Sequence, residues 1–304
     1  MCCLFGIVDP RRVLSVKQKN RMVSALAVAA EARGTDATGI AYNVRGHLSI
    51  YKRPYAGHIM RFHLSQDLGA AVIGHTRMQT QGKASRNRNN HPFRGHVPGQ
   101  DFALAHNGVI WNDQILRGAM ELPETSIETD SYIAVQMIEQ SKTLSFDSLK
   151  DMAEKLRGSF TFTILGAQDD LYIVRGNSPL CLYYYPRKEL YLYASTEEIL
   201  KAALRKFRIN EKPQKIPMAE GDILRINAWG ERSWGRFDWK ERSGSFYEAC
   251  CCDLYEYPAE DTYLEDLRFL AATFGHTSQE VDELVQAGFA PEEIEEFLYC
   301  GEEW

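Results

Sequence analysis

The sequence predicts an α+β domain built from layers of antiparallel sheet and helix, and two observations support this fold class. Short β-rich runs and segments of helical periodicity mix through the first 240 residues. Turn residues such as Asp169-Asp170 and Pro186-Arg187 separate neighbouring β-rich runs, which is typical of hairpins. Strands and helices in this order indicate a layered α+β domain.

The predicted strands are short runs rich in β-branched, aromatic and other apolar residues, bounded by turn residues. We expect strands at residues 4–8, 38–43, 48–52, 71–75, 102–106, 160–165, 171–175, 180–185 and 189–194. The predicted helices show apolar residues at helical spacing. Residues 16–33 place Met22, Leu26, Val28 and Ala29 on one side, and further helices are expected at 129–140, 146–156 and 196–206.

Charge divides the chain near residue 240. Residues 241–304 hold 17 acidic residues against two arginines, a net charge of −15, whereas residues 1–240 carry a net charge of +9. The segment 241–245 has the composition of a linker. We therefore expect one domain at 1–240 and an acidic tail at 241–304, which is either a docking segment or a solvated surface.

The tail has the pattern of three short helices, at 263–273, 278–286 and 291–298. Ser278 opens the second helix with Glu280 close behind, and Pro291 occupies the first position of the third. The apolar residues of these helices would supply only a very small core. No internal repeat or low-complexity tract is visible in the sequence.

Composition excludes several classes of protein. With 304 residues, 44% hydrophobic and 25% charged, the chain is not disordered, collagenous or a coiled-coil rod. It contains no apolar run of membrane-spanning length and no signal-peptide pattern, so we expect a cytoplasmic protein that does not meet a membrane. Seven cysteines without a secretory signal are expected to be reduced thiols.

Cys250, Cys251, Cys252 and Cys300 are the residues that raise the question of zinc. They lack the two-residue gaps of zinc sites, and no close pair of histidines accompanies them. We therefore expect no metal and no other cofactor, and we interpret these cysteines as small apolar residues.

Cys2 is a candidate nucleophile because of its position. Removal of Met1 would leave Cys2 with a free α-amine beside its own thiol. Since an α-amine has a pKa of about 7.7 to 8.0, part of it is neutral at physiological pH and can accept the thiol proton. On this residue alone the evidence is weak, because a cysteine at position two is usually an accident of sequence.

Six short motifs in one order give Cys2 its significance. The motifs are Cys2-Cys3-Leu4-Phe5-Gly6-Ile7, Arg33-Gly34-Thr35-Asp36-Ala37-Thr38-Gly39, Gly74-His75-Thr76-Arg77-Met78-Gln79-Thr80-Gln81-Gly82, Asn90-His91-Pro92-Phe93, His106-Asn107-Gly108 and Glu128-Thr129-Asp130-Ser131. Together they resemble the class II glutamine amidotransferases, whose N-terminal-nucleophile domains hydrolyse glutamine. The glucosamine-6-phosphate synthase type is the most similar, and the resemblance covers about residues 2 to 230.

The resemblance implies a four-layer αββα sandwich with Cys2 as the nucleophile. It also implies that the Asn107 side chain and the Gly108 backbone N–H stabilise the oxyanion that forms on the substrate amide. The alternative for Asn107 and Gly108 is a tight turn after a strand, and both descriptions can hold together.

The resemblance also implies a binding site for free L-glutamine. Arg77 matches the position that holds the α-carboxylate, and Asp130 matches the acid that holds the α-ammonium. Thr80 and His91 would line the pocket, and Arg33 would brace the surroundings of the nucleophile. The alternatives are a surface ion pair for Arg77, a helix N-terminal acid for Asp130, a helix C-terminal cation for Arg33 and simple packing for His91.

A loop at 82–94 is expected to be mobile and to close over bound glutamine. Its basic residues lack interleaved aromatic residues, so nucleic-acid binding is not expected. Three positions depart from the pattern of the family. The family usually has glycine where this chain has Cys3, tryptophan where it has Met78, and often histidine where it has Gln81. These departures concern the floor of the pocket and the loop that closes it.

Family members usually pass ammonia to an attached synthase, isomerase or transferase domain. Residues 241–304 are too few for such a domain. We therefore expect a glutaminase that delivers ammonia to a separate acceptor protein, with the acidic tail as the candidate docking segment. Two alternatives remain, a non-catalytic binding or regulatory protein that keeps the fold and an amidohydrolase for another amide. Arg77 and Asp130 argue against the latter because they suit a free amino acid.

Overall fold

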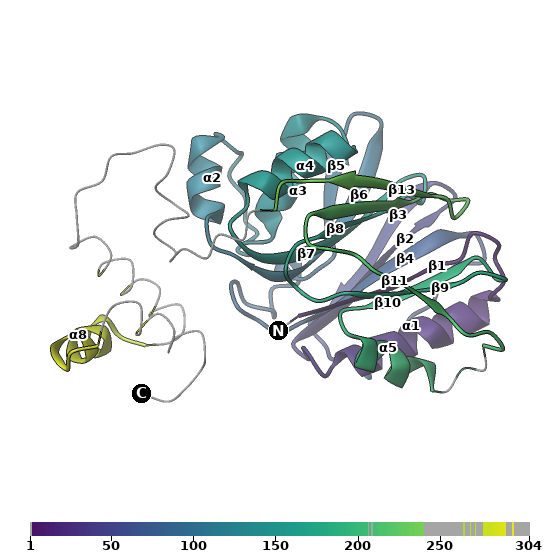
Figure 1. The fold of residues 1–304 in the computed structure, drawn as a ribbon, viewed down its shortest axis with the longest axis horizontal. Helices are drawn as coiled ribbons and strands as arrows, with labels where there is room; N and C mark the ends of the chain where they lie inside the picture. The colour runs from purple at the N-terminus through teal and green to yellow at the C-terminus, as the bar shows by residue number, and fades with distance from the viewer. Residues whose placement is uncertain are drawn as a thin grey trace. The chain divides into compact units, whose positions relative to one another are not determined.

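The structure is a computed structural model that describes residues 2–205, 207, 209–239, 264, 268, 271, 276–289 and 294. The chain divides into two compact units, Met1–Trp239 and Lys240–Trp304. The first unit has four layers, with two sheets in the middle and helices on both outer faces (Figure 1). This arrangement confirms the predicted α+β sandwich.

The first sheet has seven strands, and every neighbouring pair is antiparallel. Its spatial order is β11, β9, β10, β1, β4, β2, β3, so the N-terminal strand lies at its centre. The bounds are β1 (Cys3–Val8), β2 (Ala37–Val44), β3 (His47–Arg53), β4 (Leu68–Arg77), β9 (Cys181–Tyr185), β10 (Leu190–Ala194) and β11 (Gln214–Ile216).

The second sheet has six antiparallel strands in the order β13, β12, β8, β7, β6, β5. Its longest strand, β6, pairs with β7 over nine residue positions and carries the predicted oxyanion residues. The bounds are β5 (Phe93–Val97), β6 (Gln100–Ile110), β7 (Gly158–Gly166), β8 (Leu171–Arg175), β12 (Asp222–Ile226) and β13 (Arg232–Arg236).

Helices cover the outer face of each sheet. The first sheet is covered by α1 (Val16–Ala30) and α5 (Glu197–Leu204), and the second by α3 (Tyr132–Ser141) and α4 (Phe146–Lys155). A shorter helix, α2 (Asp113–Ala119), follows β6, and a 3-10 turn, η1 (Asn87–Asn89), precedes β5. Ser15 begins α1 and Ser145 begins α4, each with a hydroxyl that accepts a hydrogen bond from the third backbone N–H of its helix.

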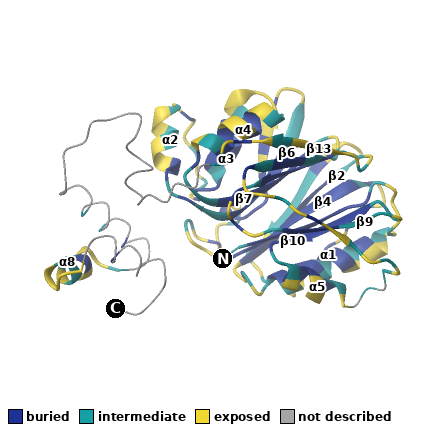
Figure 2. Ribbon diagram, in the orientation of Figure 1, coloured by how far each residue is buried: buried dark blue, intermediate teal, exposed yellow. Residues whose placement is uncertain are grey.

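Alternation along β1 shows how the layers hold together. Leu4 and Val8 point into the apolar core between the two sheets, whereas Phe5 and Ile7 point into the core under α1. Figure 2 shows both sheets buried and the outward faces of the helices exposed. Because β1 is buried on both faces, the residue directly before it, Cys2, is held at a defined place.

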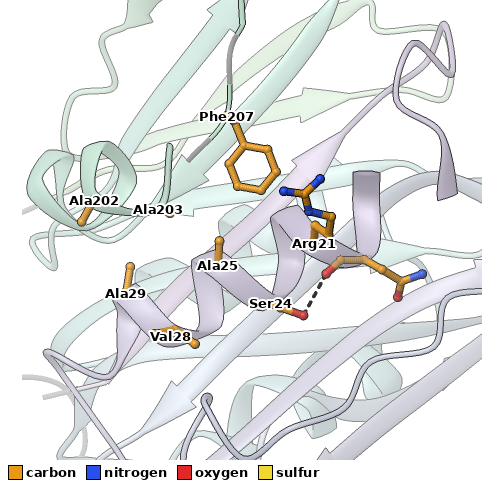
Figure 3. A pocket seen from close by; sticks show the side chains of 9 residues that line it. Arg21, Ser24, Ala25, Val28, Ala29, Ala202, Ala203 and Phe207 are labelled. Atoms are coloured by element: carbon orange, nitrogen blue, oxygen red, sulfur yellow. Dashed lines mark hydrogen bonds between the residues drawn. The ribbon is translucent and has the colours of Figure 1, made fainter. Parts of the chain in front are cut away.

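A groove of about 530 Å³ lies between α1 and α5. In Figure 3, Ala25 and Ala29 of α1 and Ala202 and Ala203 of α5 line it, and Phe207 lies at its edge. The residues that line the groove include no predicted site residue. The groove is therefore separate from the candidate active site.

All nine predicted strands of the first 240 residues are present, with bounds extended or shifted by a few residues, and the four helices also form. The sequence analysis missed β5, β11, β12, β13 and α2. The strand β5 alternates buried and exposed residues, but its polar Arg94 and His96 concealed the pattern. Gly95 is needed there because a Cβ atom would lie 2.1 Å from the ring of Phe102.

In the second unit, α8 (Ser278–Gln286) forms where a helix was predicted. Its N-cap is Thr277 rather than Ser278, because the Thr277 hydroxyl accepts from the Glu280 N–H. Val281 is buried in a small cluster with Ala271 and Ile294. Pro291, Cys250–Cys252, Cys300 and most of the two flanking predicted helices lie outside the described residues.

Across the described residues, no helix has both the length and the apolar character needed to span a bilayer.

Candidate active site

Cys2 lies at the start of β1, next to the end of β4. The register of the sheet pairs Cys3 with Thr76, which brings Cys2 beside Arg77. The Cys2 Sγ lies 3.5 Å from the backbone oxygen of Met78, and Arg33 Nε donates a 2.8 Å hydrogen bond to the Cys2 carbonyl. Arg33 therefore fixes the backbone of the candidate nucleophile from the loop after α1.

The electrostatic surroundings keep the Cys2 thiol protonated. Burial raises its pKa most strongly, the charge of Arg77 lowers it by less, and the charge of Asp130 raises it further. A thiol in this state attacks only when a base removes its proton. The same interactions show that Arg77 and Asp130, 53 residues apart in sequence, both lie within electrostatic reach of Cys2.

Arg77, the last residue of β4, is buried with its guanidinium held by a loop. Its Nη1 donates to Asn90 Oδ1 at 2.9 Å, and its Nη2 donates to the backbone oxygens of Gly82, at 2.7 Å, and Gln81. Burial lowers the pKa of Arg77. Gln81 thus contributes through its backbone oxygen, an interaction that does not depend on which side chain stands there.

Gly34 permits the close contact between the Arg33 loop and β4. A Cβ atom at Gly34 would lie 2.4 Å from the carbonyl carbon of Arg77 and 2.6 Å from the amide nitrogen of Met78. The loop is also tied to β4 by the Asp36 N–H, which donates to the Arg77 oxygen at 2.9 Å. Only glycine lets the two backbones approach this closely.

Asn107 and Gly108 lie within β6, where they pair with Thr161 and Phe160 of β7. The alternative of a tight turn at Asn107-Gly108 is therefore wrong, because the strand continues to Ile110. The Asn107 Nδ2 lies 3.4 Å from Ser195 Oγ, which accepts a hydrogen bond from the Leu4 N–H. Ser195 therefore connects the Asn107 side chain to the beginning of β1.

Gly108 has a backbone conformation that favours glycine, with a φ of 140°. A Cβ atom there would lie 1.9 Å from the oxygen of Ser159. Glycine is therefore required at position 108 because any side chain there would collide with the backbone of β7.

Asp130 lies in the turn before α3 and is buried. Its Oδ2 accepts a 2.7 Å hydrogen bond from the Ile110 N–H, and its Oδ1 lies 3.3 Å from Ser131 Oγ. Burial raises the pKa of Asp130, against the effect of hydrogen bonds from the Ile110 and Ser131 backbone and of the Arg77 charge. The carboxylate is thus attached to the strand that carries Asn107 and Gly108.

The segment 82–94 is anchored by Glu128. The Glu128 carboxylate forms an ion pair with Arg86 and accepts a 2.9 Å hydrogen bond from Asn89 Nδ2, while its N–H donates to Asn89 Oδ1 at 3.0 Å. The segment also contains η1 and the first residues of β5, so only part of it is loop. These contacts hold it next to Arg77.

His91 is buried in a stack of rings. Its ring centroid lies 4.2 Å from that of His75 and 4.3 Å from that of Phe93, and burial holds its pKa well below the usual range. Among the described residues, neither ring nitrogen of His91 has a hydrogen-bond partner. The contacts of this ring are therefore those of a packing residue, the alternative that the sequence left open.

Lys52 is a residue of the site region that the sequence analysis missed. Its Nζ donates to the backbone oxygens of Asn90 and, at 3.1 Å, Pro92, and it lies 5.0 Å from the centre of the Phe93 ring. Burial lowers its pKa to about 8. No sequence signal distinguishes this lysine from the other lysines of the chain.

The structure brings most of the predicted site residues to one place. Cys2, Arg33, Arg77, Asp130 and Asn107 are connected by the contacts described above. Thr80 is exposed in the loop after β4, and within the described part of the chain no hydrogen bond joins it to another predicted site residue. The described residues contain no group of three or more His, Cys, Asp or Glu side chains that could hold a metal ion.

Comparison with known proteins agrees with this geometry. Residues 75–202 match the family model of a glutamine amidotransferase domain. A glutamine–fructose-6-phosphate aminotransferase (isomerizing) of Bacillus thuringiensis subsp. konkukian is 31% identical over 157 residues, which are 49% of this chain and 26% of that protein. The enzyme of the same name from Staphylococcus aureus is 32% identical over 192 residues, 60% of this chain and 30% of that protein.

A solved structure gives the same fold. The glutamine phosphoribosylpyrophosphate amidotransferase from B. subtilis, complexed with ADP and GMP, superposes with a TM-score of 0.60 at 20% identity and covers 79% of this chain and 50% of that chain. The chain spans less than a third of the length of the curated relatives named above. The predicted resemblance is confirmed: residues 75–202 match the model of a glutamine amidotransferase domain, and the chain is similar to the class II glutamine amidotransferases.

Proposed function

We propose that this chain hydrolyses L-glutamine to L-glutamate and ammonia through a thioester on Cys2. The observation that supports this most directly is the placement of a protonated Cys2 thiol within electrostatic reach of both a buried cation, Arg77, and a buried acid, Asp130. A free amino acid presents a carboxylate and an ammonium, so this pair matches both of its charges.

In the proposed complex, Arg77 binds the α-carboxylate of glutamine and Asp130 binds the α-ammonium. A guanidinium has five N–H donors, and the bonds to Asn90, Gln81 and Gly82 fix its plane while leaving donors for a carboxylate. Arg33 supports the site through the Cys2 backbone. Thr80 is proposed to line the pocket, and His91 is proposed to support it by packing rather than by contact with glutamine. Binding both charged groups aims the side-chain amide at Cys2.

The reaction needs a base because burial keeps the thiol protonated. After removal of Met1, the α-amine of Cys2 takes the thiol proton as Sγ attacks the amide carbon. The carbonyl oxygen becomes an oxyanion, which the Asn107 side chain and the Gly108 N–H stabilise. The protonated α-amine of Cys2 then gives its proton to the leaving nitrogen of the substrate amide. Ammonia departs, and a thioester between Cys2 and the glutamyl group remains.

Water completes the cycle. The neutral α-amine accepts a proton from water as the oxygen attacks the thioester, and the proton returns to sulfur when glutamate leaves. The thiol and the amine are thereby restored.

We further propose that the ammonia passes to a separate acceptor protein and that the acidic tail is a docking segment for it. The support is the net charge of −15 in residues 241–304, which contrasts with the net charge of +9 in residues 1–240. The chemistry of the acceptor is not part of this proposal.

The test uses 6-diazo-5-oxo-norleucine, an alkylating analogue of glutamine. Intact mass should show a chain that has lost Met1 and gains a single adduct, which disappears in Cys2→Ala. Cys181→Ala removes a different buried thiol and should leave labelling unchanged. Retained Met1 with no adduct would refute the proposal and favour the non-catalytic alternative, whereas labelling with turnover of other amides in preference to glutamine would favour the general amidohydrolase.

A further inference from the structure

A series of close polar contacts connects the proposed oxyanion strand to the proposed ammonium site. His106, the residue before Asn107, places its Nδ1 2.7 Å from Ser131 Oγ. The same Ser131 oxygen lies 3.3 Å from Asp130 Oδ1. The three side chains are buried, so their hydrogen bonds are not exchanged with bulk water.

The proton positions in this chain follow from its acceptors. His106 Nε2 lies 3.3 Å from the backbone oxygen of Ser159, and a carbonyl only accepts, so Nε2 carries a proton. Burial lowers the pKa of His106 to about 3, so the ring is neutral and Nδ1 carries no proton. The Ser131 hydroxyl therefore donates its single proton to His106 Nδ1.

Packing fixes the His106 ring in this orientation. The ring stacks on Phe162, with centroids 4.7 Å apart and planes 25° apart. The backbone oxygen of His106 accepts a 2.9 Å hydrogen bond from His75 Nε2. Nδ1 is thus held within reach of the serine.

The consequence concerns Asp130. Its Oδ2 accepts from the Ile110 N–H, whereas Oδ1 receives no proton from the Ser131 hydroxyl while His106 accepts that proton. We propose that His106 and Ser131 are positioning residues that keep Oδ1 of Asp130 free to bind the α-ammonium of the substrate. This inference rests on the proposed function, because it assigns the ammonium of glutamine to Asp130.

The experiment compares substitutions that keep or remove the acceptor at Nδ1. In His106→Gln, the side-chain amide can replace Nε2 but not Nδ1, so the Ser131 hydroxyl is released to donate to Asp130 Oδ1 and competes with the substrate. The KM for glutamine should rise about tenfold with kcat changed by less than about threefold. In His106→Asn, the amide oxygen lies near the position of Nδ1, and KM should stay within about threefold of the wild type.

A double variant separates this role from a structural one. In His106→Gln/Ser131→Ala the competing hydroxyl is absent, so the KM should return towards the wild-type value. If His106 merely stabilises the fold, the second substitution removes one more buried contact and the defects add. Glutaramate, which is glutamine without the α-amine, supplies the second control, because its kcat/KM should be the same in the wild type and in His106→Gln.

NMR of 15N-histidine-labelled protein gives a readout that needs no turnover. The expected result is the Nε2–H tautomer for His106, with an Nδ1 signal that shifts in Ser131→Ala. An Nδ1–H tautomer, equal defects on glutamine and glutaramate, or an additive double variant would overturn the inference. A wild-type chain with neither glutamine turnover nor a Cys2 adduct would instead refute the proposed function, and the tautomer would still decide the His106 to Ser131 hydrogen bond.

Discussion

Replacing Gly34 with alanine tests whether the contact between the Arg33 loop and β4 holds the site together. The new Cβ atom would lie 2.4 Å from the Arg77 carbonyl carbon. Carbon atoms in contact are normally about 3.5 to 4.0 Å apart, so the loop or the strand must move by about 1 Å. Because the obstructing atoms are backbone, no side-chain rotation can relieve the overlap.

The magnitude follows from that displacement. Overpacking of this kind costs about 1 to 3 kcal/mol, and for a domain of this size each kcal/mol lowers Tm by about 2 to 4 °C. A displacement of about 1 Å at the residues that hold the nucleophile and the substrate carboxylate should lower kcat/KM by about a hundredfold. Denaturant titration and a coupled glutamate assay, normalised to the fraction of Cys2 that can be alkylated, measure the two effects.

Gly118→Ala is the matched control. Gly118 lies in α2, and a Cβ atom there would have no neighbour within 4 Å. Alanine in a helix should stabilise the domain by about 0.5 to 1 kcal/mol and leave activity unchanged. If Gly34→Ala behaved like Gly118→Ala in both assays, the steric explanation of the Arg33-Gly34 motif would be refuted.

Two further predictions concern carboxylates near the site. Glu128→Gln should weaken the ion pair with Arg86 and the hydrogen bond from Asn89. The backbone amides of the segment 82–94 should then exchange with solvent roughly two- to fivefold faster in a hydrogen-exchange experiment. An unchanged exchange rate would show that Glu128 does not anchor this segment. Burial raises the pKa of Asp113 to about 6, and the charge of Asp130 adds to this effect. The folded state therefore binds the Asp113 proton more tightly than the unfolded state does. The stability of the domain should fall as the pH rises from about 4 to 6. Asp113→Asn should remove that slope and stabilise the domain by about 1 to 2 kcal/mol at pH 7, after allowance for partial solvent screening; a denaturation midpoint below that of the wild type at pH 7 would contradict it.

Local patterns predicted the strands and helices whose apolar residues follow one period. The strand β1 is a continuous apolar run that is buried on both faces, and the helix α1 buries the face that its 3.6-residue period predicts. Patterns failed where burial depends on distant neighbours. The edge strand β13 (Arg232–Arg236) has mostly exposed residues, and Gly95 in β5 is explained only by the ring of Phe102 across the sheet.

The candidate site shows the same division. Ordered motifs pointed to Cys2, Arg77, Asn107 and Asp130 through the family resemblance, and their roles stay predictions. Lys52 carries no such signature, and its contacts with the backbone oxygens of Asn90 and Pro92 exist only because β3 lies beside that segment.

The sequence by itself determined the fold class and the family resemblance, and through that resemblance it supplied the residues proposed to bind and attack glutamine. Those conclusions depend on the local periodicity of apolar residues and on the order of short motifs along the chain. Both are properties of the sequence that do not depend on folding. The tertiary structure alone decided that Asn107-Gly108 is strand rather than turn, that His91 is enclosed by rings and that Ser131 Oγ lies 2.7 Å from His106 Nδ1. These outcomes depend on distances between atoms far apart in the chain, and only the packing of the two sheets sets such distances.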